Sequence, residues 1–380
     1  MTFAAITGWG KCMPPAVLSN ADLSTFMDTN DEWITSRTGM KERRISHVPA
    51  VDMAHIAALR ALACAGLKPT DIDLIVYGSC SNDETVPNTA SALQYKLGAD
   101  GVAAMDVNTA CTSFLYGLST ANAMIRTGVI KRALVVGVEL ISRYMDWENR
   151  NVAVLFGDGC AAVVLEATPE RTGLLGETLG CYGDARGILR VEGYGATYAN
   201  RNIVFGDMLW TFDGPQIFKK AVQGMCEASA KTLAKVGVPA SQIDLVVPHQ
   251  ANSRIIESVA KYAGVPMEKV FMTVQKYGNM SAATVPVALV DAIEAGRVTP
   301  NAKLLMPAFG AGLTLCSHYV EWGTRVTPKD VSNAELPPCE KTALEMVNEI
   351  RALKDPRGRS AAGIASAYVV DKTPYVSAAA

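Results

Sequence analysis

Two segments of this chain, 171 residues apart, are similar enough to indicate that one structural unit occurs twice. AGLKPTDIDLIVYG at residues 65–78 and VGVPASQIDLVVPH at residues 236–249 align without a gap, and each runs from a helix end through a turn into an apolar strand. ACTSFLYGLSTANAMIRTG at 110–128 and GNMSAATVPVALVDAIEAG at 278–296 align at an offset of 168. A repeat this long is a domain rather than one turn of a solenoid.

Short apolar strands that alternate with helices predict an α/β fold with mixed or parallel sheets covered by helices on their faces. We place a first half at residues 1–168 and a second half at residues 169–325. Residues 326–380 are a C-terminal extension, in which EKTALEMVNEIRALKD predicts one helix. The expected apolar stripe of this helix consists of Leu344, Met346, Val347, Ile350 and Leu353.

Composition excludes several classes of function. The chain has 380 residues, of which 49% are hydrophobic, so a soluble globular protein is expected. Its net charge of −2 offers no bulk attraction to nucleic acid or to an anionic membrane. No segment reaches the roughly 18 consecutive apolar residues of a membrane helix, and no basic leader opens the chain, so we expect a cytoplasmic location.

The nine cysteines are scattered and form no CxxC pair, which suggests neither a zinc site nor a disulfide framework. Most are expected to be reduced and buried. Cys111 differs because it follows the strand-like VAAMDVN and opens a helical run. The positive end of a helix favours thiolate and lowers a cysteine pKa, which makes a nucleophile. The alternative is a small residue needed where a helix meets a sheet.

Two further polar residues follow the same logic. His249 ends the apolar strand of DLVVPHQANSR, with a core histidine as the alternative, and Asn279 in KYGNMSAATVP precedes a helix, with an ordinary N-cap as the alternative. The offset of 168 pairs Cys111 with Asn279, and the offset of 171 pairs His249 with Gly78. Open α/β sheets put ligand crevices at such positions, so halves packed about a pseudo-twofold axis would bring the three side chains together. Neutral His and Asn side chains would offer two N–H donors to an enolate or thioester oxygen, which suggests covalent acyl catalysis followed by carbanion chemistry.

The segment PAFGAGLTL closes the second half. Gly310 and Gly312 permit close approach of the backbone, so that an amide N–H here can form an oxyanion hole. As a dinucleotide-binding fingerprint the segment fails, because it lacks a third glycine and precedes a strand.

Taken in order, six motifs resemble those of β-ketoacyl-acyl-carrier-protein synthase III, an initiating condensing enzyme of the thiolase superfamily. The likeness covers about residues 3–323 and rests on NDEWITSRTGMKERRI, DVNTACTSFLYGLSTA, NRNVAVLFGDGCAAVVLEA, VVPHQANSRII, YGNMSAATVPVAL and AFGAGLTLCS. It implies a five-layered αβαβα fold of two duplicated halves, a homodimer, and a catalytic triad of Cys111, His249 and Asn279. Thiolases have a second cysteine in place of the asparagine, and elongating synthases have a second histidine.

The resemblance implies a decarboxylative Claisen condensation in fatty acid biosynthesis. An acyl-CoA acylates Cys111, malonyl-ACP (the thioester on acyl carrier protein) loses CO₂, and the resulting carbanion attacks the acyl thioester to give 3-oxoacyl-ACP. His249 and Asn279 would hold the enolate oxygen, and the backbone N–H groups of Cys111 and Ala311 would hold the tetrahedral oxyanion. The family often has glycine at the position of Ala311. Acyl-CoA is a substrate, so neither a resident cofactor nor a metal is expected.

For coenzyme A, the resemblance implies that Trp33 stacks on adenine, that Arg37 and Arg150 lie near the nucleotide, and that Asn252 lines the pantetheine tunnel. A solvated helix edge with a capping tryptophan is the alternative. Family members often have asparagine where this chain has Pro215, a departure that leaves the contact with pantetheine at this position open.

Two further assignments come from the resemblance. Lys219, Arg254 and Lys261 would form a basic patch that docks the acidic carrier protein, although surface solvation also explains three such residues. Short-chain members commonly have a bulky aromatic residue where NDETVPNT has Val86, so we expect an acyl pocket for a primer longer than acetyl, such as a medium-chain group, at about 0.8 kcal/mol per buried methylene.

Two rival functions stay open at this point. One is an acyltransferase of the same fold that moves an acyl group from Cys111 to a hydroxyl or amine in secondary metabolism, a reaction with no need for Asn279. The other is a non-catalytic module that binds acyl-CoA or carrier protein.

Overall fold

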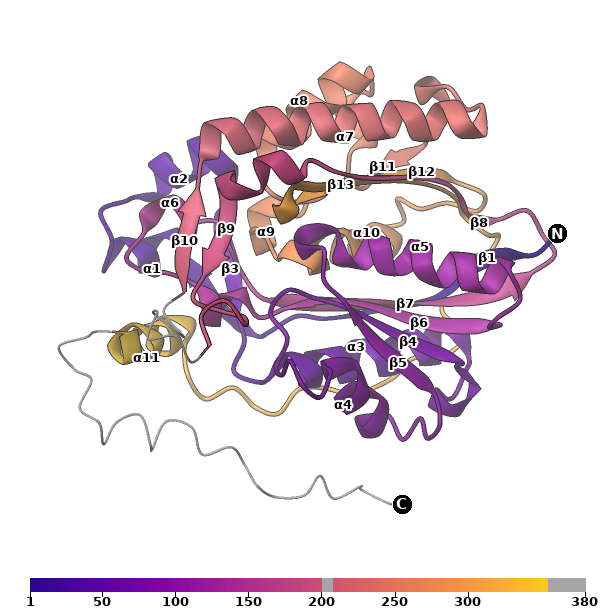
Figure 1. Cartoon of the computed structure of the whole chain (residues 1–380), viewed down its shortest axis with the longest axis horizontal. Coiled ribbons are helices and arrows are strands. Elements are labelled where there is room, and N and C mark those ends of the chain that lie inside the picture. The colour runs from indigo at the N-terminus through magenta and orange to yellow at the C-terminus, as the bar shows by residue number, and fades with distance from the viewer. Residues whose placement is uncertain (200–207, 355–380) are drawn as a thin grey trace.

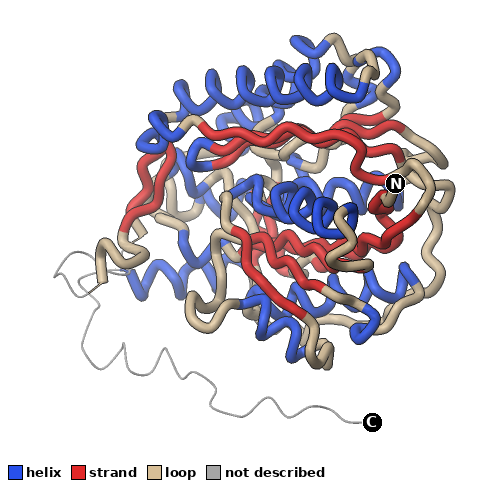
Figure 2. The backbone as a smooth tube through the Cα atoms, turned by 45° about the vertical axis from the view of Figure 1, so that its right-hand side comes forward, coloured by secondary structure: helices blue, strands red, loops and turns tan. Residues whose placement is uncertain are grey.

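The computed structural model describes residues 1–199 and 208–354. Two mixed sheets lie one above the other with helices between them, and further helices cover each outer face (Figure 1). The rotated view in Figure 2 shows the same order of layers. The five-layered αβαβα architecture implied by the resemblance is therefore confirmed. Within the described ranges, no helix combines the length and the hydropathy needed to cross a bilayer.

The first sheet has the strand order β1-β7-β6-β4-β5. Its strands are β1 (Phe3–Cys12), β7 (Gly159–Thr168), β6 (Arg132–Glu139), β4 (Leu74–Gly78) and β5 (Ala103–Val107). β4 pairs in parallel with β5 and β6, whereas β7 is antiparallel to β1 and β6. The helices α3 (Ala50–Ala65) and α4 (Thr89–Lys96) cover its outer face. α3 approaches β1 so closely that a Cβ added at Gly10 would lie 2.7 Å from the Ala57 carbonyl oxygen.

The second sheet has the order β11-β12-β13-β8. Its strands are β11 (Leu245–Val246), β12 (Lys303–Gly310), β13 (Thr314–Glu321) and β8 (Gly173–Cys181). The helices α7 (Gly214–Val236) and α8 (Ser253–Ala263) form the outer layer on this side, with α7 lying directly on the sheet (Figure 1). α7 begins at the Asp213 N-cap, whose carboxylate accepts from the Gln216 N–H at 3.1 Å.

The central layer consists of α5 (Ser113–Arg126) and α10 (Thr284–Glu294), which lie between the two sheets. α10 is apolar around nearly its whole circumference, as expected for a helix covered on both sides. A short 3-10 helix precedes each of them, Ala110–Thr112 before α5 and Ser281–Ala283 before α10. These two helix starts face each other at the centre of the molecule, where the two 3-10 helices are in direct contact.

The two helix starts correct one inference from the sequence. The Asn108 carboxamide oxygen accepts from the Ala110 N–H at 3.1 Å, and the Asn279 oxygen accepts from the Ser281 N–H at 2.8 Å. Ala110 and Ser281 share a left-handed backbone, with φ of 51° and 45°. The counterpart of Asn279 is therefore Asn108, at an offset of 171, and the sequence pairing of Cys111 with Asn279 is wrong.

The cause of that error is the length of the central helices. α5 has 14 residues and α10 has 11, so the second helix is shorter by three. The glycines after these helices, Gly128 and Gly296, therefore align at 168, whereas the residues before the helices align at 171. A comparison without gaps applies the offset of 168, which is correct at the helix ends, to the helix starts as well, where the correct offset is 171.

Smaller elements flank one end of the two sheets. They are β2 (Ala16–Ser19), β3 (Glu42–Ile45), α1 (Asn20–Ser24), α2 (Asp31–Thr38), α6 (Arg150–Ala153), β9 (Leu189–Glu192), β10 (Leu209–Phe212), α9 (Val274–Tyr277) and α11 (Ala343–Lys354). α11 buries Ala343, Met346 and Val347. Leu353 is 54% exposed, so its assignment to the apolar stripe is wrong. The face of α11 that packs on the protein begins at Ala343.

Candidate active site

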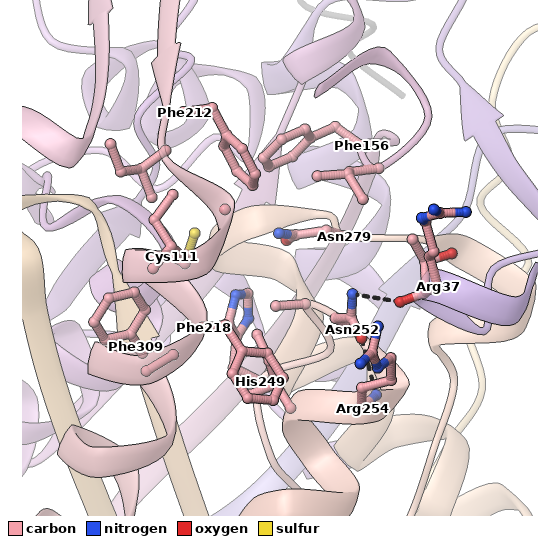
Figure 3. A pocket seen from close by; sticks show the side chains of 18 of the residues that line it. Arg37, Cys111, Phe156, Phe212, Phe218, His249, Asn252, Arg254, Asn279 and Phe309 are labelled. Atoms are coloured by element: carbon pink, nitrogen blue, oxygen red, sulfur yellow. Dashed lines mark hydrogen bonds between the residues drawn. The ribbon is translucent and has the colours of Figure 1, made fainter. Parts of the chain in front are cut away.

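A cavity of about 640 Å³ reaches from the surface to the starts of the central helices. Cys111, His249 and Asn279 line its inner part, and their side chains converge on one space in Figure 3. They come from the start of α5, the end of β11 and the start of α10. The fold therefore brings together the three residues that the sequence singled out, although the symmetry relation assumed between two of them was wrong.

Cys111 lies in the 3-10 helix before α5 rather than in the first turn of α5 itself. Gly310 packs against it so tightly that an added Cβ would lie 2.9 Å from the Cys111 nitrogen. Burial raises the pKa of the Cys111 thiol to about 12, while hydrogen bonds from the Ser281 hydroxyl and from the N–H groups of Cys111 and Ala311 favour the thiolate. The lowered pKa expected at a helix start is wrong here, because desolvation outweighs those donors.

The two backbone N–H groups expected to form an oxyanion hole, those of Cys111 and Ala311, both point to the Cys111 sulfur. Gly310 makes this geometry possible, because any side chain at that position would collide with the Cys111 backbone. A tetrahedral centre formed on the sulfur would therefore have its oxygen close to two amide donors.

His249 follows β11 and continues its ladder, with its N–H donating to the Pro307 carbonyl at 2.9 Å. The side chain is only 3% exposed, and burial lowers its pKa from 6.5 to about 3. The imidazole is therefore neutral at physiological pH. Its Nδ1 lies 2.5 Å from the Thr284 hydroxyl at the start of α10, which fixes the orientation of the ring.

The backbone and the side chain of Asn279 are both anchored. Its N–H donates to the Leu155 carbonyl at 2.8 Å, its carbonyl accepts from the Gly157 N–H at 3.1 Å, and its carboxamide oxygen holds the Ser281 N–H. With the oxygen engaged there, the carboxamide NH₂ is the group directed at the cavity, and the side chain points toward Cys111 in Figure 3.

Residues that the sequence reasoning missed support the three. The Glu139 carboxylate is fully buried beneath the site and accepts from the Ala282 N–H at 3.2 Å and the Ser79 hydroxyl at 3.2 Å. The hydroxyls of Ser281 and Thr284 contact Cys111 and His249. A hydroxyl residue opens each central helix, Ser113 in the first half and Thr284 in the second. These two residues align at the offset of 171, so the correctly aligned repeat could have marked Thr284 as a candidate.

The wall of the cavity around the cysteine is aromatic. Phe309 and Phe218 lie near Cys111 and His249, while Phe156 and Phe212 lie on the opposite side of the same space (Figure 3). No sequence pattern marked these four, because they come from β12, α7, β10 and a loop and meet only in the fold. They form an apolar environment in which an acyl chain would be removed from water.

Trp33, Arg37 and Asn252, which were expected to bind coenzyme A, line the cavity, and Arg150 lies beside Trp33. The guanidinium groups of Arg37 and Arg150 lie 4.6 Å and 5.2 Å from the centroid of the Trp33 ring. The Arg150 guanidinium donates to the Asp28 carbonyl at 2.7 Å. Asn252 caps α8 and donates to the Arg37 carbonyl at 3.0 Å, so its side chain joins two elements of the fold (Figure 3).

Pro215 lines the cavity at the first turn of α7, where proline costs no helical hydrogen bond. Arg254 lines the cavity as well, and Lys261 lies on the same face of α8 about 10 Å along the helix. Lys219 is exposed on α7, which packs against α8. The three predicted docking cations therefore lie on two adjacent helices beside the mouth.

Val86 was predicted to border the acyl pocket, but the fold keeps it away from the cavity. It is 89% exposed and is absent from the cavity lining. Its loop lies instead beside β5, where the Asn88 side chain donates to the Ala104 carbonyl at 3.3 Å.

Sequence families match two parts of the chain: 3-oxoacyl-[acyl-carrier-protein] synthase III over residues 105–183, and the C-terminal region of that enzyme over residues 233–322. A β-ketoacyl-[acyl-carrier-protein] synthase III 2 of Vibrio cholerae is 49% identical over 347 residues, which are 91% of this chain and 96% of the relative. The chain belongs to the β-ketoacyl-acyl-carrier-protein synthase III family.

Two further members extend the comparison. A synthase III of Roseiflexus castenholzii is 41% identical over 84% of this chain and 98% of its own length. The crystal structure of the Aquifex aeolicus 3-oxoacyl-[acyl-carrier-protein] synthase III has a TM-score of 0.79 at 39% identity, covering 84% of this chain and all of that one. The chain is thus a condensing enzyme of fatty acid biosynthesis, which joins an acyl primer to malonyl-ACP.

Proposed function

We propose that this synthase takes its primer from an acyl-CoA and that the triad divides the reaction into two steps. In the first, the Cys111 sulfur attacks the acyl thioester and coenzyme A leaves as its thiol. In the second, malonyl-ACP loses CO₂, its carbanion attacks the acyl-cysteine, and the Cys111 thiol is released with 3-oxoacyl-ACP. The observation that carries this proposal is one apolar cavity lined by Cys111, His249 and Asn279.

The second step needs donors for the enolate oxygen of the malonyl group. Asn279 supplies its NH₂ group, and His249 supplies Nε2–H if the Thr284 hydroxyl donates to Nδ1. The same hydroxyl lies 2.9 Å from the Ser281 carbonyl, which is a competing acceptor. We propose that the hydroxyl donates to Nδ1, because only this arrangement leaves a proton on Nε2 for the enolate oxygen.

The first step must remove a proton from a thiol whose pKa is raised by burial. The N–H groups of Cys111 and Ala311 and the Ser281 hydroxyl stabilise the charge that develops, first on sulfur and then on the tetrahedral oxygen. No resident cofactor enters either step of this proposal, because the thioesters carry the reactive groups.

The aromatic and basic residues around the cavity support a proposal for how coenzyme A and the acyl carrier protein bind. We propose that Trp33 stacks on the adenine of coenzyme A with Arg37 and Arg150 beside its phosphates, and that Asn252 contacts pantetheine. The three exposed cations beside the mouth would dock the acidic carrier protein, a contact that should weaken with salt. These cations are Lys219, Arg254 and Lys261.

We further propose a primer longer than acetyl, such as a medium-chain acyl group. The apolar wall of Phe156, Phe212, Phe218 and Phe309 supports it, because each buried methylene contributes about 0.8 kcal/mol. Acylation rates over a series of acyl-CoA lengths test it, and a clear maximum at acetyl-CoA would contradict it.

A homodimer is the proposed assembly, in the cytoplasm. β5 is an edge strand whose residues are all at least partly exposed, and an unpaired edge of this kind can pair with a second copy. Val86 lies on the loop beside that edge, so a second copy is the route by which it would reach an acyl pocket. Light scattering on the purified chain would measure the mass.

The rival functions differ in the fate of the enzyme after it meets an acyl-CoA. Adding an acyl-CoA alone should shift the mass of Cys111, which a non-catalytic binding module would not show. Adding malonyl-ACP should then release CO₂ and yield 3-oxoacyl-ACP. An acyl-enzyme that instead transfers its group only to hydroxyl or amine acceptors would favour the acyltransferase.

A further inference from the structure

The chain continues beyond β13 as a C-terminal arm, defined here as residues 327–354, which crosses the outer face of α3. The Lys329 N–H donates to the Cys64 carbonyl at 3.0 Å, and the Arg60 guanidinium donates to the Ala334 carbonyl at 2.9 Å. The arm ends in α11, which packs against β2 and β3 (Figure 1). It therefore runs from one side of the first sheet to the end of the molecule that carries the cavity mouth.

α11 is anchored there by burial and by one side chain. Met346 and Val347 are buried in an apolar cluster against which Trp33 and Phe26 also pack. The Arg351 guanidinium lies 4.4 Å from the centroid of the Phe26 ring, and its nitrogens lie 3.0 Å from the Glu148 carboxylate. A guanidinium that stacks on a ring while pairing with a carboxylate is a two-sided attachment.

These contacts reach the two loops that hold the proposed nucleotide site. Phe26 stands two residues before Asp28, and Glu148 stands two residues before Arg150. Asp28 and Arg150 join the loops through an ion pair of 3.1 Å, but both side chains are well exposed. Exposed pairs of this kind contribute little on their own. The Arg150 guanidinium also donates to the Asp28 carbonyl at 2.7 Å, and the Phe26 and Trp147 rings meet edge to face at 6.4 Å. Arg351 adds to these attachments mainly through its contact with the Phe26 ring, because the Glu148 side chain is 72% exposed.

We propose that the C-terminal arm positions Trp33 and Arg150 for the nucleotide of acyl-CoA, because Arg351 of α11 holds both of the loops that lead to them. The inference rests on the proposed role of Trp33 and Arg150 in binding coenzyme A.

The test compares two primers that carry the same acyl group, one on coenzyme A and one on N-acetylcysteamine, which lacks the nucleotide. Acylation of Cys111 in the full-length chain is followed for the unmodified enzyme and for Arg351→Ala. We expect the KM for the acyl-CoA to rise about tenfold in the variant and the rate constants for the N-acetylcysteamine thioester to stay unchanged. Arg351→Lys, which keeps a cation over Phe26, should recover part of the loss.

The matched control is Lys341→Ala, which removes another cation of the arm. Its amine pairs with Glu349 at 2.7 Å and both side chains are exposed, so neither primer should be affected. A second variant, ending after Lys341, removes α11 and should lose most of the preference for coenzyme A. Binding of the adenosine bisphosphate end of coenzyme A, measured by calorimetry, should weaken in parallel.

The outcomes separate the inference from the function on which it rests. If Arg351→Ala slows both primers equally, or lowers only the melting temperature while the preference for acyl-CoA survives, the arm is a structural strap and the inference is wrong. If the unmodified enzyme shows no preference for the acyl-CoA over the N-acetylcysteamine thioester, the nucleotide site itself is wrong, and the inference falls with it.

Discussion

The starts of α5 and α10 have nearly the same backbone and carry different chemistry. In both, an asparagine oxygen accepts an N–H two residues on, the next turn begins with a left-handed residue, and a hydroxyl opens the helix. Three residues after its asparagine, the first start has Cys111 and the second has Ala282. The first asparagine, Asn108, is exposed, whereas Asn279 is buried in the cavity.

A second difference lies opposite each turn. Gly310 faces the Cys111 nitrogen, and its lack of a side chain leaves that N–H available to a substrate oxygen. Glu139 is the counterpart of Gly310 at the offset of 171, and its carboxylate accepts from the Ala282 N–H at 3.2 Å. The duplicated turn thus makes two potential oxyanion holes, one open and one filled by a carboxylate. Duplication preserved the backbone, and the proposed mechanism assigns acylation to one half and enolate binding to the other.

The largest effect is expected from substitution of Cys111, which should remove the proposed function of the first half and leave that of the second. Cys111→Ala should abolish the mass shift by acyl-CoA and reduce condensation by more than about 10³-fold, because Cys111 is the only cysteine among the described residues that line the cavity. Release of CO₂ from malonyl-ACP should persist, since His249 and Asn279 are unchanged. Mass spectrometry and CO₂ measurement check both, with the exposed Cys181→Ala as control. Condensation that survives in Cys111→Ala would refute the mechanism.

The reverse result is expected at Asn279. Asn279→Ala should leave acylation of Cys111 intact and lower CO₂ release by about 10²–10³-fold, the usual effect of losing one oxyanion donor. Asn108→Ala removes the equivalent backbone contact in the first half but no group that faces the malonyl oxygen. If both variants impair CO₂ release equally, Asn279 is an N-cap and nothing more.

Features that depend on neighbouring residues in the sequence could be predicted, whereas features that depend on contacts between distant residues could not. Cys111, His249 and Asn279 could be found because each stands at a strand end or a helix start, and local pattern marks such positions. The α/β class followed from the repeat for the same reason, and the motifs around these residues supplied the five layers. The offset at the helix starts was missed, because a three-residue difference within α10 is invisible in a gapless comparison.

The features that escaped the sequence depend on distant contacts. Glu139 reaches Ala282 across 143 residues, and Thr284 reaches His249 across 35, so no periodicity marks either pair. The raised pKa of Cys111 has a similar origin, because the helix start is local, whereas the burial that outweighs it arises in the fold, where Gly310 and Ser281 of the second half approach the cysteine. The attachment of Arg351 to Phe26 and Glu148 is likewise visible only once the arm has crossed the molecule.

A pH experiment isolates His249, whose counterpart in the first half is Gly78. Its pKa is about 3 in the fold because of burial and about 6.5 when unfolded, so only the unfolded chain binds this proton as the pH falls below 6.5. The free energy of unfolding should therefore fall by about 2 kcal/mol between pH 7 and pH 5 on account of this residue.

The measurement is urea unfolding at both pH values for the unmodified chain and for His249→Gln. His318, with a pKa lowered to about 3, acts in the same direction, and Asp158, with a pKa raised to about 6, acts in the opposite one, but both are present in the two proteins. A difference between the proteins that does not change with pH would mean that the imidazole is accessible to protons in the fold.

The smallest expected effect concerns the hydroxyls that open the two central helices. Thr284→Val removes the group that holds His249 Nδ1, so the tautomer with Nε2–H is no longer favoured. CO₂ release from malonyl-ACP should then fall about tenfold, which corresponds to about 1.4 kcal/mol in the barrier, and Thr284→Ser should restore it. Ser113→Ala removes the equivalent hydroxyl, whose hydrogen-bond partners among the described residues are the Ala110 carbonyl and the Thr109 N–H, and should leave CO₂ release unchanged. Equal losses in Thr284→Val and Ser113→Ala would show that both hydroxyls only brace their turns, and a loss in Thr284→Val alone would tie the second hydroxyl to the histidine.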